Sequence, residues 1–347
     1  MNLALAKRYN SFKTPKISKG LGITLLLACC VLTSLSVGAF SIPFFDILAG
    51  SLNDQQEAVL YSIRLPRILL AGLVGAGLAV SGAALQGLFR NPLADPQLIG
   101  VSSGAALAVA LTIVFIGTIE LAGFITLFAL SGAAFLGGLV TCLLIFKIAS
   151  ISGKISVAHM LLAGIAISAI AFSGIGFLSY ISDDQQLRAI TFWTMGSLGG
   201  ALWSQVAICA VFVIPCCFAL FRQGQALNIL QLGEEESRYL GIEPEKVKNR
   251  AILAIALCVG VCVSVSGIIG FVGLVIPHLI RLSIGPDHRH LLPLSALLGA
   301  ALLVVADTIA RTAVAPAEMP VGILTALIGG PYFLWLLTKQ YKKGFTL

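Results

Sequence analysis

The sequence predicts an all-α integral membrane protein with ten transmembrane helices. Of its 347 residues, 58% are hydrophobic and only 11% are charged. Soluble domains carry roughly 45–50% apolar and about 25% charged residues, so no soluble core of this length could hide so much apolar surface. The apolar residues also fall into long runs, and basic residues gather in alternate connections between the runs. These observations exclude a soluble enzyme, a nucleic-acid-binding protein and a disordered chain.

Ten segments are apolar over about the 20 residues that a helix needs to cross a bilayer. They cover roughly 21–45, 64–86, 97–116, 121–146, 156–181, 190–221, 248–268, 271–284, 290–312 and 321–338. The eighth is short and contains Pro277, which indicates a partial or broken span. We do not expect the first to be a cleaved signal peptide, because it is long, lacks a clear cleavage site and follows the basic stretch 1–20.

The positions of Lys and Arg orient the chain, because positive connections stay in the cytoplasm. If residues 1–20 are cytoplasmic, all but four of the 22 basic residues lie on that side. The exceptions are Arg64, Arg67, Arg188 and Arg311, on a side that is otherwise acidic. An odd number of spans would place the basic C-terminal end on the acidic side, so ten spans are favoured. Both termini are therefore predicted to be cytoplasmic.

The cysteines indicate packing rather than chemistry. All eight lie within the apolar segments: Cys29, Cys30, Cys142, Cys209, Cys216, Cys217, Cys258 and Cys262. A buried cysteine behaves as a small hydrophobic residue. Cys258 and Cys262 lie one helical turn apart, but no acidic residue or histidine shares their segment. We expect neither disulfides nor a metal site.

The glycines are concentrated in the apolar segments, where four-residue spacing such as Gly100 to Gly104 lets helices approach closely. A shift of 185 residues also places Gly75 on Gly260 and Pro92 on Pro277, a weak internal repeat. The repeat would relate spans 2–5 to spans 7–10 in opposite orientations. Inverted repeats of this kind are typical of transporters.

The spans lack the groups that catalysis or proton coupling requires. The sequence has no Walker A motif, no H-E-x-x-H, no G-x-S-x-G and no pair of carboxylates inside a span. Asp307 is the one intramembrane acid, and Arg311, four residues later on the same helix face, is its expected ion-pair partner. We expect no catalytic residues, and a pathway whose energy comes from another protein.

The longest polar stretch, 222–250, mixes charges with apolar residues and is interrupted by Gly233 and Gly241. This pattern predicts one or two short amphipathic helices at the cytoplasmic face over 228–241. Two interpretations stay open on the pattern alone: a solvated connector, or a docking surface for a cytoplasmic partner.

Several motifs together resemble one family of transport proteins. They are Arg64-Leu-Pro-Arg67, Val80-Ser-Gly-Ala-Ala-Leu-Gln86, Arg90-Asn-Pro-Leu-Ala-Asp-Pro96, the stretch Gly270–Arg281, Asp307-Thr-Ile-Ala-Arg311 and the stretch Pro320–Gly330. The chain resembles the FecCD-type permease subunits of ATP-binding-cassette (ABC) importers for iron chelates, haem and vitamin B12. The resemblance covers about residues 60–338 and implies ten spans, in agreement with the charge distribution.

The resemblance implies roles for two groups of residues. Acidic residues of a periplasmic binding protein would bind Arg64, Arg67 and Arg311 of this chain. Arg64 and Arg67 can instead anchor the second span at the membrane surface. The stretch 228–241 would form coupling helices that seat on an ATPase. Its implied coupling residues are Leu230, Leu232, Gly233, Arg238, Tyr239, Leu240 and Gly241.

The cargo is inferred from the stretch 183–199, which looks like that of the haem-uptake members. The stretch 150–158 resembles the family's cytoplasmic gate, and the fifth span resembles the wall of its pathway. Haem needs an apolar, aromatic-tolerant path, and His, Met and Tyr can ligate its iron. The pathway and gate candidates are Ser152, Ser156, His159, Met160, Phe172, Phe177, Tyr180 and Met195, each of which can instead be an ordinary packing residue. His278 is expected to be structural, and His288 and His290 to be solvated.

We therefore expect a single polytopic permease domain over 1–347, in a bacterial inner membrane, with no permanently bound cofactor. Its expected partners are a second permease copy, two cytoplasmic ATPase subunits that bind ATP, a periplasmic haem-binding protein and the lipid bilayer, with no nucleic acid. Haem is the expected cargo. The alternatives are a ferric siderophore or cobalamin carried by the same machinery, a sibling permease in place of the second copy, a membrane-bound haem enzyme or electron carrier, and a partner-free channel or secondary carrier.

Overall fold

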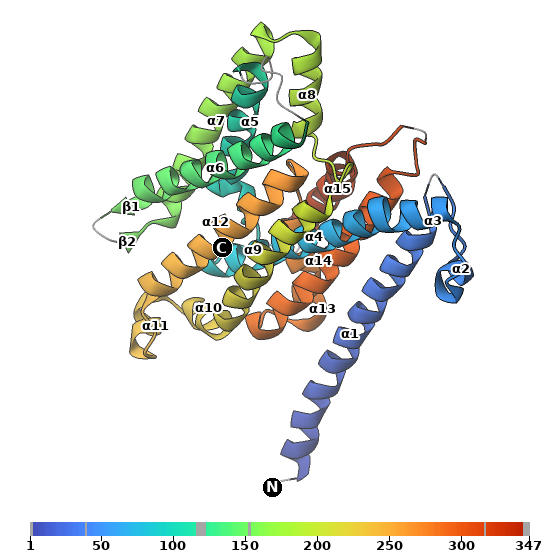
Figure 1. Ribbon diagram of the computed structural model, residues 1–347. Helices are drawn as coiled ribbons and strands as arrows, with labels where there is room; N and C mark the ends of the chain where they lie inside the picture. The colour runs from blue at the N-terminus through green and yellow to red at the C-terminus, as the bar shows by residue number, and fades with distance from the viewer. Residues whose placement is uncertain (1–2, 39, 116–122, 152–153, 316, 343–347) are drawn as a thin grey trace.

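A computed structural model describes residues 3–38, 40–115, 123–151, 154–315 and 317–342 (Figure 1). Ten long helices dominate it: α1 (Leu3–Ser36), α4 (Leu65–Leu88), α5 (Val101–Phe115), α6 (Gly123–Ala149), α7 (Val157–Ile181), α9 (Trp203–Arg222), α12 (Pro244–Ser266), α13 (Val272–Ile284), α14 (His288–Ala310) and α15 (Val321–Lys342). The connections carry α2 (Phe44–Ala49), α3 (Asp54–Val59), the π-helical turn η1 (Leu60–Arg64), the 3₁₀ turn η2 (Pro96–Ile99), α8 (Asp184–Thr194), α10 (Gly224–Leu230) and α11 (Glu234–Tyr239). A two-residue antiparallel hairpin, β1 (Ser150–Ile151) with β2 (Lys154–Ile155), joins α6 to α7.

The all-α membrane fold predicted from the sequence is confirmed, and each predicted span coincides with one long helix. Among the described residues, seven helical segments are long and apolar enough to cross a membrane, and α5, α13 and α15 supply shorter apolar helices. The 13 residues of α13 extend about 20 Å at 1.5 Å per residue, short of the roughly 30 Å hydrocarbon core. That all ten helices cross the bilayer stays a prediction.

Three predicted boundaries are wrong, and glycine explains two of them. The first predicted span reaches 45, but α1 ends at Ser36 and a separate short helix, α2, begins at Phe44 after Pro43. The third span begins at Val101 rather than 97, because Gly100 (φ 74°) ends the preceding 3₁₀ turn in the left-handed region. The sixth begins at Trp203 rather than near 190. Residues before it belong to α8 and to a turn in which Gly196 (φ 71°) and Gly200 (φ 73°) reverse the chain.

The helices pack as two groups joined by α12 (Figure 1). In one group α5, α6 and α7 lie side by side; in the other α4 is enclosed by α9, α12, α13 and α14. The helices α4 and α14 pack closely at Gly75 and Gly299. A Cβ at Gly75 would lie 2.8 Å from the carbonyl carbon of Gly299, closer than side chains approach backbone, so the two helices meet backbone to backbone.

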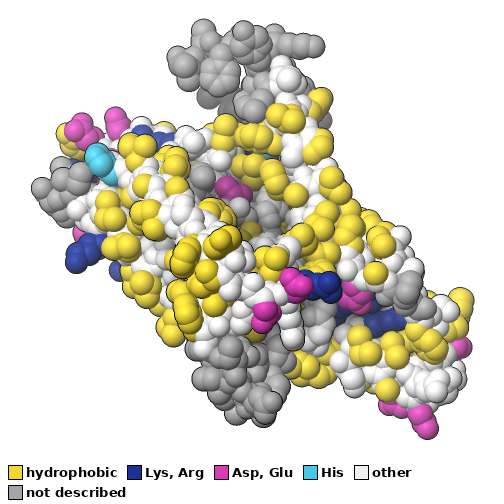
Figure 2. Space-filling view, turned by 90° about the horizontal axis from the view of Figure 1, so that it is seen from above, with side chains coloured by type: hydrophobic (Ala, Val, Ile, Leu, Met, Phe, Trp, Pro, Cys, Tyr) yellow, Lys and Arg dark blue, Asp and Glu magenta, His cyan; other side chains and the backbone are white. Residues whose placement is uncertain are grey.

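The outer surface has the polarity that a bilayer requires. Figure 2 shows one face, where hydrophobic side chains are widespread and charged ones form groups at either end and near the middle. Large apolar side chains on α7 and α9 are exposed, among them Leu162 (66%), Ile170 (70%) and Val211 (68%). Such a surface is stable against lipid chains rather than water.

We call the end of the bundle that carries α10, α11 and the hairpin the basic end. The acidic end carries α2, α3, α8 and residues 311–315 and 317–320. The charge distribution predicts that the basic end is cytoplasmic. The internal repeat also stays a prediction. Its shift of 185 residues superposes α4 largely on α12, but it carries α5 onto 286–300, within α14, rather than onto α13.

Candidate functional sites at the two ends of the bundle

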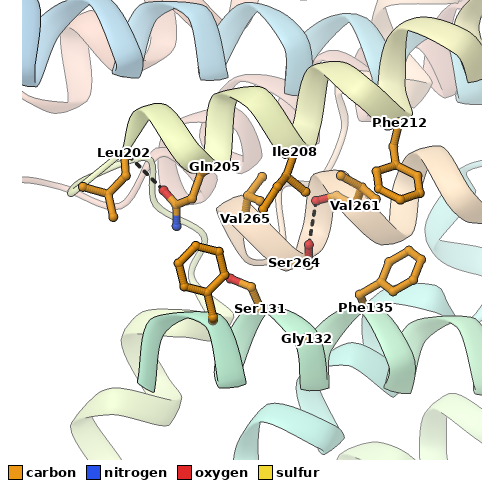
Figure 3. A pocket seen from close by; sticks show the side chains of 11 residues that line it. Ser131, Gly132, Phe135, Leu202, Gln205, Ile208, Phe212, Val261, Ser264 and Val265 are labelled. Carbon is orange, nitrogen blue, oxygen red and sulfur yellow. Dashed lines mark hydrogen bonds between the residues drawn. The ribbon is translucent and has the colours of Figure 1, made fainter. Parts of the chain in front are cut away.

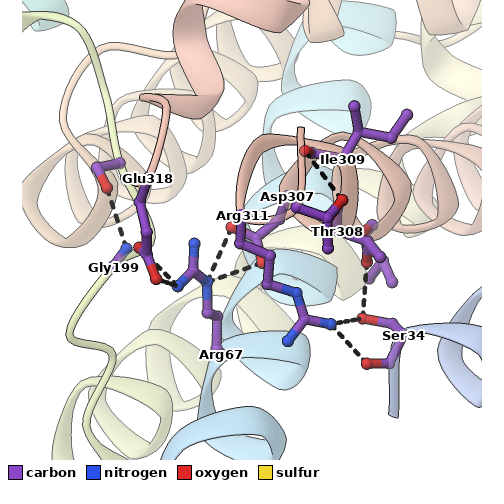
Figure 4. A network of polar contacts seen from close by, with 11 residues as sticks. Ser34, Arg67, Gly199, Asp307, Thr308, Ile309, Arg311 and Glu318 are labelled. Atoms are coloured by element: carbon purple, nitrogen blue, oxygen red, sulfur yellow. Dashed lines mark hydrogen bonds and ion pairs between the residues drawn. The ribbon is translucent and has the colours of Figure 1, made fainter. Parts of the chain in front are cut away.

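A buried ion-pair network lies at the acidic end, where α4 meets α14 (Figure 4). The Nε atom of Arg67 lies 3.0 Å and 2.9 Å from the two carboxylate oxygens of Asp307, and its Nη1 atom lies 3.0 Å and 2.9 Å from those of Glu318. The side chains of Arg67 and Asp307 are 6% and 2% exposed, whereas that of Glu318 is 51% exposed. The network therefore ties α4 to α14 and to the connection between α14 and α15.

The expected ion pair between Asp307 and Arg311 is wrong. Arg311 instead turns toward α1, where its Nη2 atom donates to the backbone oxygen and, at 2.9 Å, to the hydroxyl of Ser34. Helical spacing brings Asp307 and Arg311 onto one face, but α4 supplies a guanidinium group that reaches the carboxylate from the neighbouring helix. No local sequence signal indicated Arg67 as this partner, or Glu318 as a member of the network.

Arg64, the third predicted docking arginine, is also held inside the chain. Its guanidinium group donates to the backbone oxygens of Leu35 and Ser36 at the end of α1 and of Phe40 just beyond it. Arg64, Arg67 and Arg311 are 2%, 5% and 7% exposed. In this conformation, none of the three presents a free guanidinium group to a docking protein. Their docking role stays a prediction, and it requires these internal contacts to open.

The pathway candidates do not all share one surface. Phe172, Phe177 and Tyr180 are 55%, 64% and 86% exposed on α7, and Met195, just after α8, is 37% exposed. Met160 is fully buried in the core of the bundle, so it lines no open path here.

The gate candidates lie where α7 begins. Ser156 caps the helix, and its hydroxyl lies 2.8 Å from Nδ1 of His159, so the ring is oriented by its own helix turn. Ser152 lies outside the described residues. The aromatic candidates therefore form an exposed face along α7, with His159 at its basic end.

At the basic end, the predicted amphipathic segment forms two short helices, α10 and α11. The side chains of Leu232, Tyr239 and Leu240 are 64%, 91% and 57% exposed at its tip, and Arg238 is exposed beside them. Leu230 is only 3% exposed, because it packs into the bundle. Leu230 therefore offers no exposed surface to a partner in this conformation, and its coupling role stays a prediction.

Two glycines shape this tip. Gly233 (φ 139°) separates the two helices and Gly241 (φ 80°) ends the second, both in conformations that side-chain-bearing residues rarely adopt. The result is a small apolar knob, formed by Leu232, Tyr239 and Leu240, on a charged surface.

The helix α10, which precedes the knob, is hydrogen-bonded to the start of α14. Asn228 of α10 donates to Asp287 at 2.7 Å and accepts from the backbone N–H of His288 at 2.9 Å. The predicted solvation of His288 is wrong: its ring is fully buried, and Nδ1 lies 2.9 Å from the same Asn228 oxygen. Hydrogen bonds from Arg289, and then from Asn228, hold the pKa of Asp287 well below its usual range.

Ion pairs with α12 hold the segment a second time. Lys248 is buried, and its Nζ atom lies 2.8 Å from Glu234 of α11 and 3.1 Å from Glu245. Lys248 therefore connects the segment that carries the knob to α12, and Asn228 connects it to α14. Because α14 also carries Asp307, this one helix connects the segment at the basic end with the ion-pair network at the acidic end.

An apolar cavity of about 200 Å³ lies between α6, α9 and α12 (Figure 3). Phe135, Ile208, Phe212 and Val261 form much of its wall, with the polar side chains of Ser131, Gln205 and Ser264 among its lining. No predicted pathway residue lines it. Its lining suits hydrocarbon rather than an ion.

Comparison with known proteins identifies the architecture. Residues 25–339 match the FecCD transport family. The chain belongs to this family. It is 51% identical over 329 residues to the Hemin transport system permease protein HmuU of Yersinia pestis, a match that covers 95% of this chain and 97% of that protein. It is 40% identical over 319 residues to the Vitamin B12 import system permease protein BtuC of Vibrio cholerae, covering 92% and 93% of the two.

A solved metal-chelate-type ABC transporter in an inward-facing conformation has the same fold, with a TM-score of 0.83 and 37% sequence identity over 93% of this chain and 99% of that one. As a FecCD protein, the chain is a permease subunit of an ABC importer, not an enzyme. The resemblance and the function class predicted from the sequence are thus confirmed.

Proposed function

We propose that this FecCD permease carries haem across the bacterial inner membrane. The observation that carries the proposal is the 51% identity, over nearly the whole chain, to a hemin transport permease. The exposed aromatic face of α7, formed by Phe172, Phe177 and Tyr180, supports it because a flat apolar macrocycle packs well on aromatic rings. Haem is the cargo here, not a resident cofactor, and ATP is bound by a partner subunit.

The proposed assembly contains two copies of this permease, two ATPase subunits and a periplasmic haem-binding protein, with both permease termini in the cytoplasm. The apolar knob of Leu232, Tyr239 and Leu240 would seat on the ATPase. Tyrosine is a residue type enriched at interface hot spots, and the two exposed leucines extend the apolar patch around it, which favours docking over a solvated connector.

Movement of the ATPase would reach the opposite face through the hydrogen bonds described above. Asn228 would pull on Asp287 and the start of α14, and α14 would carry the displacement to Asp307. Binding-protein docking would act on the same network from outside. An incoming carboxylate would first replace Glu318 on Arg67, because Glu318 is the half-exposed member.

The ligand selectivity of the reconstituted importer tests this proposal. We would assemble the permease with its ATPase in proteoliposomes, add the haem-loaded binding protein, and measure ATP hydrolysis and haem accumulation. We expect haem to accumulate and to stimulate hydrolysis. The matched measurements use cyanocobalamin and a ferric siderophore, each with its own binding protein. Accumulation of either one with no haem uptake would overturn the haem assignment.

Cobalamin is the second candidate, favoured by the 40% identity to a vitamin B12 permease. A ferric siderophore is the third, because the inward-facing transporter that shares this fold is of the metal-chelate type. Both candidates use the same knob and ion-pair network. The proteoliposome measurements therefore separate the cargoes without altering the proposed machinery.

A further inference from the structure

A cavity of about 310 Å³ opens at the basic end, between the last turn of α9 and the first turns of α12. Its lining includes Arg222 of α9, Lys246 and Arg250 of α12, and Glu243 just before α12. The side chains of all four are exposed. None of them belongs to the knob or to the residues that connect its segment to α12 and α14. The permease function described above therefore leaves this cavity unexplained.

The cavity has a surplus of positive charge. Glu243 lies 2.9 Å from Lys246 and compensates that cation alone. In the part of the chain that the structure describes, no carboxylate forms an ion pair with Arg222 or Arg250. The neighbouring acids are committed elsewhere, since Glu234 and Glu245 bind the buried Lys248. Two guanidinium groups are thus left to bind an anion.

An apolar strip leads from the cavity onto the membrane-facing surface. The guanidinium carbon of Arg222 lies 5.9 Å from the ring centre of Phe218, one turn back along α9. Phe218 and Ile214 are 59% and 58% exposed, and Leu253, one turn along α12 from Arg250, is 54% exposed. Arg222 and Arg250 therefore lie where the basic end meets the apolar surface.

We propose that this cavity binds the headgroup of an anionic phospholipid. The phosphate lies between Arg222 and Arg250, and an acyl chain runs along Phe218, Ile214 and Leu253. Basic pockets between helices at the membrane surface recognise anionic headgroups by charge, and aromatic and aliphatic side chains beside them hold the chain. A soluble anion would use the two arginines but not the apolar strip, so the combination favours a lipid.

The proposed lipid site also adjoins the knob. Gly241 and Ile242, the residues directly after the knob, belong to the cavity lining. Occupancy by a headgroup therefore fixes the end of the segment that the proposed ATPase contact would move. On this proposal the site does not depend on which cargo the permease carries.

Native mass spectrometry of the full-length chain, titrated with phosphatidylglycerol or phosphatidylcholine, tests the proposal. We expect phosphatidylglycerol to bind more tightly than phosphatidylcholine. The double variant Arg222→Gln/Arg250→Gln should bind phosphatidylglycerol about 30-fold more weakly, since each cation near the surface contributes roughly a factor of five. The matched control, Arg90→Gln/Arg238→Gln, removes two exposed charges from the same end outside the cavity and should bind normally.

Two further variants separate charge from apolar contact. Glu243→Gln removes the only carboxylate of the lining and should tighten phosphatidylglycerol binding several-fold. Phe218→Ser keeps both arginines and should weaken it.

Three results would overturn the proposal. One is equal binding of the two lipids, which would leave only apolar contact. Another is displacement of phosphatidylglycerol by millimolar inorganic phosphate at constant ionic strength, which would assign the arginines to a soluble anion. The third is loss of the bound lipid when the ATPase subunit is added, which would make the cavity part of the subunit interface.

Discussion

The substitution Asp307→Asn tests whether the ion-pair network at the acidic end stabilises the fold. It keeps the size of the side chain and one acceptor oxygen but removes the charge opposite Arg67, which lies 2.9 Å away and is 6% exposed. Arg67 would then keep only Glu318, which is half-exposed and therefore screened by solvent. A nearly buried guanidinium group would be left without its buried counter-charge.

The expected magnitude follows from burial. Removing one partner of a buried ion pair costs about 3–5 kcal/mol. The remaining contact with Glu318 offsets part of this, so we expect about 3 kcal/mol. At roughly 2–3 °C per kcal/mol for a large helical chain, the melting temperature should fall by about 6–9 °C. Glu318→Gln removes a partly exposed pair, which contributes about 1 kcal/mol or less, and should lower it by only about 2 °C.

The assay is thermal unfolding of the purified permease in detergent, followed by circular dichroism at one pH and ionic strength. The compensating variant Arg67→Met/Asp307→Leu replaces both buried charges with apolar side chains of similar size. Because a buried pair can be exchanged for apolar groups at little cost, this double variant should melt above Asp307→Asn.

Two outcomes would refute the reasoning. If Asp307→Asn and Glu318→Gln lowered the melting temperature equally, the burial of Asp307 would have no energetic consequence. If the double variant melted below Asp307→Asn, the penalty would come from lost packing rather than from an uncompensated charge.

Three further predictions concern other parts of the chain. Gly75→Leu should destabilise the fold by about 3 kcal/mol in the same melting assay, because its side chain would meet the backbone of α14. A Cβ at Gly72 would have no atom within 4 Å, so Gly72→Leu should be tolerated. Leu240→Asp should weaken ATPase association roughly 30-fold in a pull-down titration, and normal association would remove the apolar knob from the interface. Burial raises the pKa of Asp95, in the connection between α4 and α5, to about 6, above the value of about 4 in an unfolded chain. The stability that the neutral Asp95 side chain contributes is therefore present below pH 4 and lost as the pH rises through 6. Asp95→Asn should flatten the change in melting temperature between pH 4 and pH 7. An unchanged profile would contradict the burial of this carboxyl group.

The sequence predicted those features that depend on local composition. Runs of apolar residues placed ten helices, because the hydrocarbon core sets both their length and their polarity. Its motifs also identified the family, and Gly233 and Gly241 marked the breaks that separate and end the two short helices. Boundaries failed where a glycine turn was itself apolar, as between α8 and α9, since hydropathy does not distinguish an apolar turn from a helix.

The tertiary structure decided which side chains meet. Helical spacing paired Asp307 with Arg311, but the close contact of α4 with α14 brought Arg67 to the carboxylate instead. The exposure of Leu232 and the burial of Leu230 were likewise settled only by how α10 packs on the bundle.

The sequence by itself determined that this chain crosses a membrane, which side its charges favour and which transport family it joins. Only the fold decided that the predicted docking arginines are held inside the chain, that His288 is buried against α10, and that Arg222 and Arg250 line one cavity. The reason is physical: hydropathy is a property of each segment, whereas ion pairs and hydrogen bonds form between segments that lie far apart in the chain and are brought together by packing.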